Sequence, residues 1–470
     1  MTLPRFEPQP RLLVACATLT AAVLCGLLMG ARPAAGVGFA LALGFVPLAF
    51  YNLPLALAFV APIAFIRHLP AVWVGPTLAF AVIVMAWLGT LAARRSATAG
   101  RLTQWRAVWL IGLTLVWLFL TIAWVGDPAA ATKDAVNWCV AAVLALIFYT
   151  TLSSERQVRL VLGGFVFGAL LAVSIGLAST GLRPASSALE TATYTEGRLQ
   201  AGGDPNYLAA GLVPAIVLAG GLIATTRSIL QRWGLMFAAG IITIGLAATQ
   251  SRGGLLAAIT ATVVALLVMR RHRLQVTAAI AICVGLIGFW LAISPGAFER
   301  ISNADGGGNG RADLWTVAWR VFSDHPFQGV GLSGFEQASA AYVLQPGQLT
   351  AVALIVDDPH VVHNSYLQLL AETGVIGLVL YLAVVLAALA ASWRAARLFD
   401  ARGDPDLATL ARSLLVAQAS VAVAVFFITG ATSTPFWLLY GVSGAMLLLA
   451  RKPAQEPVLG TSDRRLATVE

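Results

Sequence analysis

The sequence predicts an all-α polytopic membrane protein of about 12–14 transmembrane helices, with one large extracytoplasmic loop containing short helices. Hydrophobic residues make up 59% of the 470 residues and charged residues only 11%, whereas a soluble domain has about 25% charged residues. The mean hydropathy is +0.83. The apolar residues form long unbroken runs, which favours helices over the short alternating strands of a barrel, the other structure that can span lipid.

The apolar runs place expected spans along most of the chain. We expect them at 11–30, 36–51, 53–66, 71–92, 107–125, 134–152, 157–179, 205–225, 233–250, 253–270, 274–294, 364–392, 410–429 and 433–450. The runs 36–51 and 53–66 are short and are separated by Asn52 and Pro54, so they could form one broken or re-entrant unit. The first run continues into more apolar sequence, which indicates a retained helix and not a cleavable signal peptide.

Basic residues gather in the links on one side of the expected spans. The clusters are Arg94, Arg95, Arg101 and Arg106; Arg156 and Arg159; Arg227 and Arg232; Arg270, Arg271 and Arg273; and Arg394, Arg397, Arg402 and Arg412. Because cytoplasmic links are rich in Lys and Arg, we expect these clusters and both termini on the cytoplasmic side of a bacterial inner membrane. The net charge of +9 arises mostly from such links. No basic patch is interleaved with aromatic residues, so we expect no nucleic-acid binding.

The opposite side receives one link that is long enough to be functional. The expected organisation is a first transmembrane bundle at 1–294, an extracytoplasmic loop at 295–363, a last transmembrane bundle at 364–450 and a cytoplasmic tail at 451–470. The shorter links 180–204, 249–252 and 429–433 would lie on the same side as the loop. Within the loop, the i,i+4 spacing of Trp315 and Trp319 predicts an amphipathic helix at about 312–322. Gly329, Gly331 and Gly334 predict a tight turn after it.

The sequence contains no motif for a metal or a nucleotide. It has no DxD, Walker, GxSxG or HExxH motif, and Asp357-Asp358 is a lone acidic pair. The four cysteines lie in apolar runs without metal-ligand spacing and are expected to be buried: Cys16, Cys25, Cys139 and Cys283. We therefore expect neither a cofactor nor a metal.

Two of the five histidines stand where the loop re-enters the membrane. At an extracytoplasmic surface His360 or His363 could accept a proton from a sugar hydroxyl, because histidine titrates near neutrality. Asn364, Gln368 and Glu372 follow at i, i+4 and i+8 and form one polar stripe. Hydrogen bonding between helices is an alternative explanation for Gln368 and Glu372, whereas no packing reason is evident for His363.

Three arginines on the same side could bind a phosphate group. Arg252 lies in a tight Ser-Arg-Gly-Gly turn at the hydrocarbon boundary, where a guanidinium could clamp a diphosphate bidentately. Snorkelling to the headgroups is the alternative for Arg252. Arg198 is a second candidate, in a link where Asp204 is expected only to cap the next helix. Arg311 is a third, at the start of the loop helix, although an exposed loop arginine is commonly just solvated.

Three motifs together resemble those of the O-antigen ligase and O-antigen polymerase superfamily of bacterial envelope enzymes. They are Ser-Arg-Gly-Gly at 251–254, the loop motif Arg311…Trp315…His325-Pro…Gly329-Val-Gly331…Phe335, and His363-Asn-Ser-Tyr-Leu…Glu372-Thr-Gly374. The layout is similar over most of the chain, and the motifs are similar over about 185–380. Each motif is short, but their order and membrane sidedness together are specific.

The resemblance implies a membrane-embedded glycosyltransferase at the periplasmic face, in lipopolysaccharide or exopolysaccharide biosynthesis. The donor would be a glycan on undecaprenyl diphosphate, and the glycan would pass without metal to a hydroxyl of a glycan or lipid A-core acceptor. The family's loop histidine maps onto His363, and its periplasmic arginines map onto Arg252 and, less closely, onto Arg198 and Arg311. His360 has no firm counterpart. Ligase, polymerase and protein O-glycosylating members share these motifs, so the acceptor stays open.

The chemistry of the residues is consistent with this implied reaction. Undecaprenyl diphosphate leaves with negative charge, which cations at the outer boundary would stabilise. A neutral His363 beside the acceptor hydroxyl would act as base for a single displacement with inversion. The alternative is a secondary transporter or lipid-linked glycan flippase, which needs a polar path and usually repeats with broken helices near the midplane. We find few midplane charges and no convincing repeat. A structural scaffold would leave the histidine and the arginines unexplained.

Overall fold

The computed structural model describes residues 10–66, 74–93, 101, 104–180, 198–201, 203–294, 310–345, 349, 352–356 and 360–452. Every regular element in these residues is helical. The helices of the first half are α1 (Pro10–Ala31), α2 (Pro33–Tyr51), α3 (Leu53–Ile66), α4 (Val74–Ala93), α6 (Ala107–Thr121), α7 (Pro128–Thr151), α8 (Glu155–Thr180) and α9 (Pro205–Thr225). The remainder are α10 (Ile229–Ala248), α11 (Arg252–Val268), η2 (Arg270–His272), α12 (Arg273–Ile293), α14 (Arg311–Asp324), α15 (Phe335–Ser339), η3 (Ala340–Tyr342), α16 (Ala353–Val356), α17 (Ser365–Ala401), α18 (Pro405–Ala424) and α19 (Thr434–Arg451).

The helices confirm an all-α polytopic membrane protein. Among the described residues, seven helices are long and apolar enough to cross a membrane, and six shorter apolar helices accompany them. These thirteen helices agree with the expected range. A break at Asn52 separates α2 from α3, and Asn52 accepts a hydrogen bond from the amide of Leu55. With 14 residues, α3 is about 21 Å long, which is shorter than the hydrocarbon core of about 30 Å.

Several helix boundaries differ from those expected from hydropathy, most clearly in α7, α17 and α18. Asp127 caps α7 by accepting from the amides of Ala129 and Ala130, so this helix begins at Pro128, ahead of the expected 134. Helix α17 continues past 392 to Ala401. Helix α18 spans Pro405–Ala424, whereas the apolar run predicted 410–429. Each difference places polar residues inside a helix or apolar residues outside one, which a hydropathy pattern cannot detect.

Small residues allow the central helices to approach each other closely, as is common between membrane helices. A Cβ at Gly164 of α8 would collide with the backbone of Ala58 in α3, and a Cβ at Gly441 of α19 would collide with that of Ala145 in α7. At the centre, Ser392 of α17 donates to Gln418 of α18 at 3.0 Å, and Gln418 donates to the carbonyl of Leu439 in α19 at 3.1 Å. These contacts hold α17, α18 and α19 together as the core.

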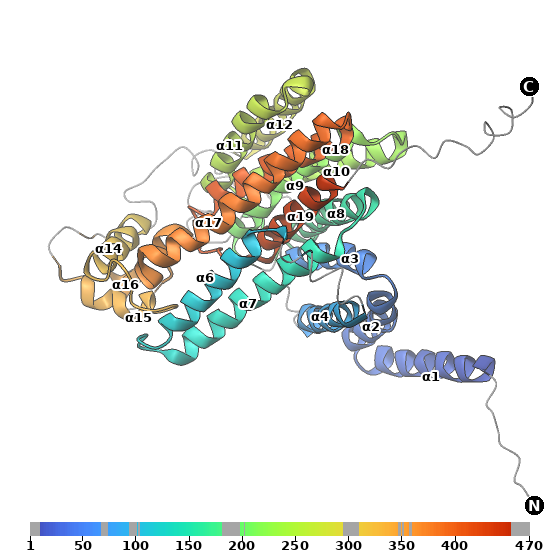
Figure 1. Cartoon of the computed structure of the whole chain (residues 1–470), viewed down its shortest axis with the longest axis horizontal. Helices are drawn as coiled ribbons and strands as arrows, with labels where there is room; N and C mark the ends of the chain where they lie inside the picture. The colour runs from blue at the N-terminus through green and yellow to red at the C-terminus, as the bar shows by residue number, and fades with distance from the viewer. Residues whose placement is uncertain are drawn as a thin grey trace, which may run out of the picture.

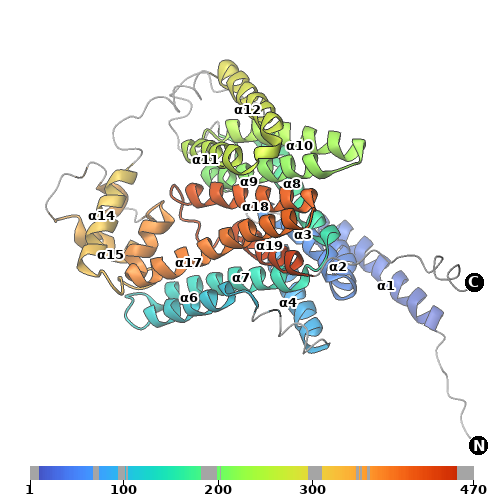
Figure 2. The same ribbon diagram turned by 45° about the horizontal axis from the view of Figure 1, so that its top comes forward.

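The two ends of the bundle differ in chemistry. The short helices α14, α15 and α16 lie together at one end, beside the start of α17 and the ends of α6 and α7 (Figures 1 and 2). Basic side chains brace the other end: Arg101 donates to the carbonyl of Thr150, Arg159 to Thr225, Arg402 to the carbonyl of Leu449, and Lys452 to that of Ser153. The described members of the basic clusters therefore lie at the end opposite the loop helices.

Candidate active site

Four links that the sequence analysis placed on one side of the membrane meet in space. The Arg198 guanidinium donates to the carbonyl of Thr249 at 2.9 Å, which joins the link before α9 to the turn before α11. The Tyr207 hydroxyl donates to the carbonyl of Thr429. The amide of His363 donates to the Thr429 hydroxyl at 3.1 Å. The segment between α18 and α19 is therefore the hub on which the other links assemble.

His363 lies directly before the N-cap of α17. Asn364 is that cap, and its side chain accepts from the amides of Tyr366 and Leu367 at 3.1 Å each. The backbone of His363 is left-handed, with φ of 54°, a conformation that is uncommon for a residue other than glycine. Such strain persists only where surrounding contacts impose it, and it is concentrated at functional sites. The ring of His363 is half-buried.

A chain of hydrogen bonds runs from the His363 backbone into the bundle. The Thr429 hydroxyl, which accepts from the His363 amide, donates to the side-chain oxygen of Gln368 at 2.7 Å. Gln368 in turn donates to the carboxylate of Glu372 at 3.1 Å, and Glu372 is 3% exposed. The polar stripe expected on α17 is thus real, and two of its members share one network with the segment that holds His363.

The electrostatic surroundings of His363 favour its neutral form. Burial lowers the pKa of His363 to about 4, and the Arg311 guanidinium and His360 add to this lowering, while Asp204 opposes it. Because these charges act on the imidazole, Arg311, Asp204 and His360 all lie near it. His360 also faces Glu336, whose pKa is raised by burial and lowered in turn by His360. Among the described residues, no group is hydrogen-bonded to the His363 ring, so a ring nitrogen can accept a proton.

The loop helix α14 is anchored one residue before His363. The indole of Trp315 donates to the carbonyl of Val362 at 3.0 Å, and its ring contacts Phe426 edge to face at 5.4 Å between centroids. Gly310 precedes the helix in a left-handed conformation, which glycine adopts without cost. The helix therefore begins at Arg311, as the sequence predicts within one residue, and brings this arginine to His363.

A break in α17 receives the turn that follows α14. Gly374 has φ of 67° inside the helix, and this break in the hydrogen-bond ladder leaves nearby carbonyls open to partners from outside the helix. Val330 and Gly331 donate to the carbonyls of Ala371 and Glu372 at 3.0 and 2.8 Å, and the Trp117 indole donates to that of Thr373 at 2.9 Å. Glycines are required because backbone meets backbone here: a Cβ at Gly329 or Gly374 would collide with the opposing main chain.

The arginines occupy different environments. Arg252 is the first residue of α11, it is exposed, and Ser251 caps the helix by accepting from the amide of Gly254. A Cβ at Gly253 would touch Phe427, so the turn carrying Arg252 lies against the same hub segment as His363. Arg198 is 4% exposed and donates to Asn206 at 3.0 Å as well as to Thr249. The geometry thus makes Arg198 a brace for the Arg252 turn.

Besides α14, three longer helices begin at this site. α9 starts at Pro205, α11 at Arg252 and α17 at Ser365, and the capping side chains are Asp204, Ser251 and Asn364. Asp204 and Asn364 therefore have the structural role of caps, which was expected for Asp204. The N-terminus of each helix carries partial positive charge. Together with Arg252 and Arg311 these termini make the site attractive to an anion.

The link 429–433 was expected on this side of the membrane, but its role as the hub, together with residues 425–428, was not expected, because Phe426, Phe427 and Ile428 continue the apolar run of α18. Within it, Ile428 accepts from the hydroxyl of Ser365 at 2.7 Å, and Thr429 makes the contacts described above. A threonine beside a glycine at the end of an apolar run was the only local signal. The Asp357-Asp358 pair lies outside the described residues, and no group of three or more possible metal-ligating side chains converges within them.

The comparisons with known proteins assign this region to a family. Residues 237–382 match the model of the O-antigen ligase family, and this range contains Arg252, Arg311, His360, His363 and Glu372. Arg198 lies before it. No curated protein matches the chain. The chain is therefore a multi-pass membrane protein that carries an O-antigen ligase domain, and the kinship with the O-antigen ligase and polymerase superfamily expected from its motifs is confirmed.

Proposed function

We propose that the protein is a glycosyltransferase that moves a glycan from undecaprenyl diphosphate to a sugar hydroxyl at the periplasmic face of the inner membrane. The observation that carries the proposal is the environment of His363, whose imidazole is held neutral beside Arg311 in a strained backbone within the O-antigen ligase domain. A neutral, half-buried base next to a cationic anion site fits the transfer of a sugar from a diphosphate to a hydroxyl.

In the proposed reaction a ring nitrogen of His363 takes the proton of the acceptor hydroxyl. The hydroxyl oxygen forms a bond to the anomeric carbon of the donor from the face opposite the diphosphate. The bond between that carbon and the diphosphate oxygen breaks, and its electron pair leaves with undecaprenyl diphosphate. One displacement inverts the anomeric configuration, and the proton on His363 is later released to solvent.

Positive charge would stabilise the departing diphosphate. Arg252 and Arg311 are the proposed contacts, because both stand at helix starts on the side where His363 lies. A guanidinium can bind two phosphate oxygens at once. We assign Arg198 a positioning role in place of the direct phosphate contact expected from the sequence, since its buried guanidinium bonds to Thr249 and Asn206. This arrangement would work without a metal ion.

The remaining site residues would act through others. Glu372 accepts a hydrogen bond from Gln368, and Gln368 accepts one from the Thr429 hydroxyl. Because Thr429 accepts from the His363 amide, this chain would fix the backbone of His363. Asn364 fixes the start of α17. His360 acts electrostatically on both Glu336 and His363. It would lower the pKa of the base but would not itself take the proton of the acceptor.

The orientation and the acceptor belong to the proposal as well. The basic clusters at the far end of the bundle support a cytoplasmic location for that end and for both termini. The acceptor would be a lipid A core for a ligase or a repeat unit on the same carrier for a polymerase. A deletion strain separates these: single repeat units accumulate without a polymerase, and full-length chains stay on undecaprenyl diphosphate without a ligase.

Transfer by the purified protein in excess EDTA tests the proposal. With an undecaprenyl-diphosphate-linked glycan and an acceptor, we expect transferred glycan and free undecaprenyl diphosphate in equal amounts. Activity that is lost in EDTA and restored by Mg²⁺ or Mn²⁺ would contradict the metal-free mechanism.

The broken α17 is the one observation that favours a transporter, since such breaks form transporter binding sites. This break, however, lies near the start of the helix, and the turn at 329–331 fills it. Movement of the intact donor across the membrane of proteoliposomes that contain the protein, without transfer of the glycan, would support a transporter function instead.

A further inference from the structure

A basic pocket lies at the end of the bundle opposite the proposed active site. It has a volume of about 340 Å³ and is formed by the end of α11, by η2 and by the facing parts of α17 and α18. Four arginines and one aspartate line it: Arg270, Arg271, Arg397, Arg412 and Asp400. The proposed reaction uses none of these residues.

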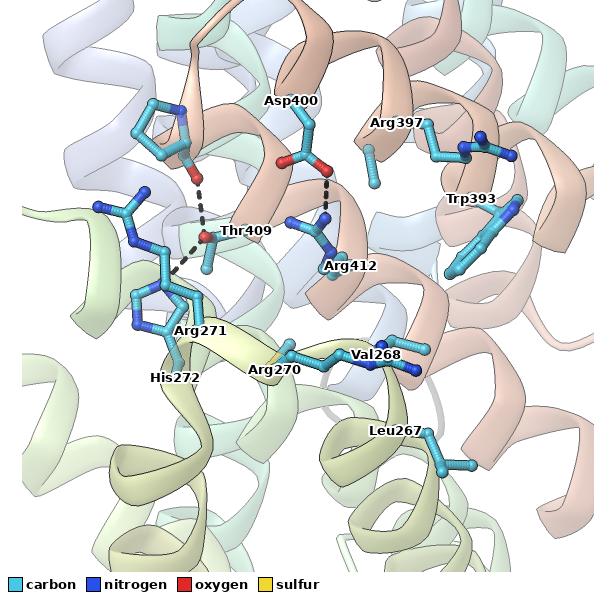
Figure 3. A pocket seen from close by; sticks show the side chains of 13 residues that line it. Leu267, Val268, Arg270, Arg271, His272, Trp393, Arg397, Asp400, Thr409 and Arg412 are labelled. Atoms are coloured by element: carbon cyan, nitrogen blue, oxygen red, sulfur yellow. Dashed lines mark hydrogen bonds and ion pairs between the residues drawn. The ribbon is translucent and has the colours of Figure 1, made fainter.

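The fold brings these cations together from segments far apart in sequence. The 3-10 turn η2 contributes both Arg270 and Arg271, whose side chains point in different directions (Figure 3). His272 fixes the turn to α18 through a 3.3 Å contact between its Nε2 and the Thr409 hydroxyl. Arg412 forms an ion pair with Asp400. Figure 3 shows Arg412 between Asp400 on one side and Arg270 on the other.

The charge of the pocket exceeds what its own carboxylate neutralises. Among the described residues, no ion pair joins Arg270, Arg271 or Arg397 to a carboxylate. A second hollow at the same end is different, because Glu155, Asp404 and Asp406 there accompany Arg159 and Arg227. A general excess of arginine on the cytoplasmic side would affect both hollows alike. The first pocket is therefore cationic for a local reason.

Apolar side chains form the wall next to the arginines. Leu267, near the end of α11, is 63% exposed, and Trp393, one turn before Arg397 on α17, is 44% exposed. An abrupt change from exposed apolar residues to arginines marks a membrane boundary, where tryptophan is enriched. The adjacent α12 is only 6% buried along its apolar window, so this part of the bundle faces lipid.

We propose that this pocket binds the headgroup of an anionic phospholipid, such as phosphatidylglycerol or cardiolipin, from the leaflet at the basic end. The phosphate would lie among Arg270, Arg397 and Arg412, and the acyl chains would run along the exposed apolar surface of α11 and past Trp393. Basic pockets between transmembrane helices bind such headgroups in general. The apolar wall selects a lipid over a soluble anion, because a free phosphate gains nothing from it.

Native mass spectrometry of the purified, delipidated protein tests the site. We expect added cardiolipin to bind and phosphatidylethanolamine not to compete. The double variant Arg270→Gln/Arg397→Gln should weaken cardiolipin binding by about fivefold for each arginine removed. Arg394→Gln is the matched control, since Arg394 is an exposed arginine on α17 that does not line the pocket, and it should bind like the wild type.

Several results would overturn the inference. One is equal binding by the double variant and the wild type; another is an equal loss in Arg394→Gln, which would show a diffuse surface-charge effect. Displacement of the lipid by millimolar inorganic phosphate would indicate a soluble anion as occupant. If the double variant fails to fold, a photo-crosslinkable anionic phospholipid on the wild type serves instead. Its label should fall at 267–272 and 393–412, and labelling elsewhere alone would contradict the site.

Discussion

At the scale of single residues, Arg252 and His363 have the most sharply defined tasks. Arg252→Ala should lower transfer by about 10²–10³-fold, because it removes one preorganised group that stabilises the leaving charge. Arg252→Lys should recover only part of the loss, since an ammonium lacks the bidentate fork. Turnover by matched amounts of purified protein measures this, with Arg232→Ala at the opposite end as control. Equal turnover by Arg252→Ala and Arg232→Ala would remove Arg252 from the site.

The pKa of His363 determines at which pH the activity should be lost on the acid side of the pH profile. With a pKa of about 4, the base stays neutral down to that pH, so kcat/KM should fall with a midpoint near 4 and not near 6.5. Arg311→Gln removes a cation that lowers this pKa, so the midpoint should move to higher pH. Arg311→Lys keeps the charge and should leave the midpoint in place. A midpoint unchanged in Arg311→Gln would show that Arg311 does not act on His363.

The same shift has a consequence for stability. Because the folded-state pKa is lower than the ordinary value, the unfolded chain binds the proton first as the pH falls. Stability contributed by neutral His363 is therefore complete above about pH 6.5 and is lost progressively as the pH falls to about 4.

At the scale of elements, hydropathy and glycine positions predicted most of the helices and the loop helix α14. They could not predict the break in α17, because the left-handed Gly374 is imposed by backbone pairing with a turn more than forty residues earlier in the chain. They placed the link 429–433 on the outer side but could not predict that it is the hub, since the contacts that Thr429 makes come from segments far away in the sequence. His363, Arg252 and Arg311 became candidates from the sequence because charge at a membrane boundary needs a reason, whereas Thr429 and Asn206 gave no such signal.

The break in α17 is a testable element of the fold. Gly374→Ala should destabilise the protein by about 1–3 kcal/mol, because φ of 67° with ψ of −174° is a conformation that essentially only glycine adopts, with a further loss from the collision with Phe327. Gly285→Ala on α12 is the control, because a Cβ there meets no atom within 4 Å and alanine favours a helix. Unfolding temperatures of the purified proteins measure both. A Gly374→Ala protein as stable as Gly285→Ala would show that the break is not required.

For the whole molecule, the proposed periplasmic reaction requires that the end carrying α14 and His363 faces the periplasm. We expect Ser323→Cys, on α14, to react with an impermeant thiol reagent added to intact cells. Arg227→Cys, in a basic link at the other end, should react only after the cells are opened. Both sites are exposed, so accessibility within the fold does not bias the comparison. The reverse pattern would place the proposed active site in the cytoplasm and exclude a periplasmic acceptor.

His363 is the proposed base of the glycosyl transfer, and comparing His363→Asn with the wild type in the purified transfer reaction tests this role most directly. Asparagine tolerates the left-handed backbone at this position, so the variant should fold, whereas His363→Ala would add strain to the loss of the ring. We expect His363→Asn to keep the wild-type unfolding temperature within a few degrees and to lose about 10²–10⁴-fold in transfer. Near-normal transfer by a folded His363→Asn protein would contradict the role of His363 as base.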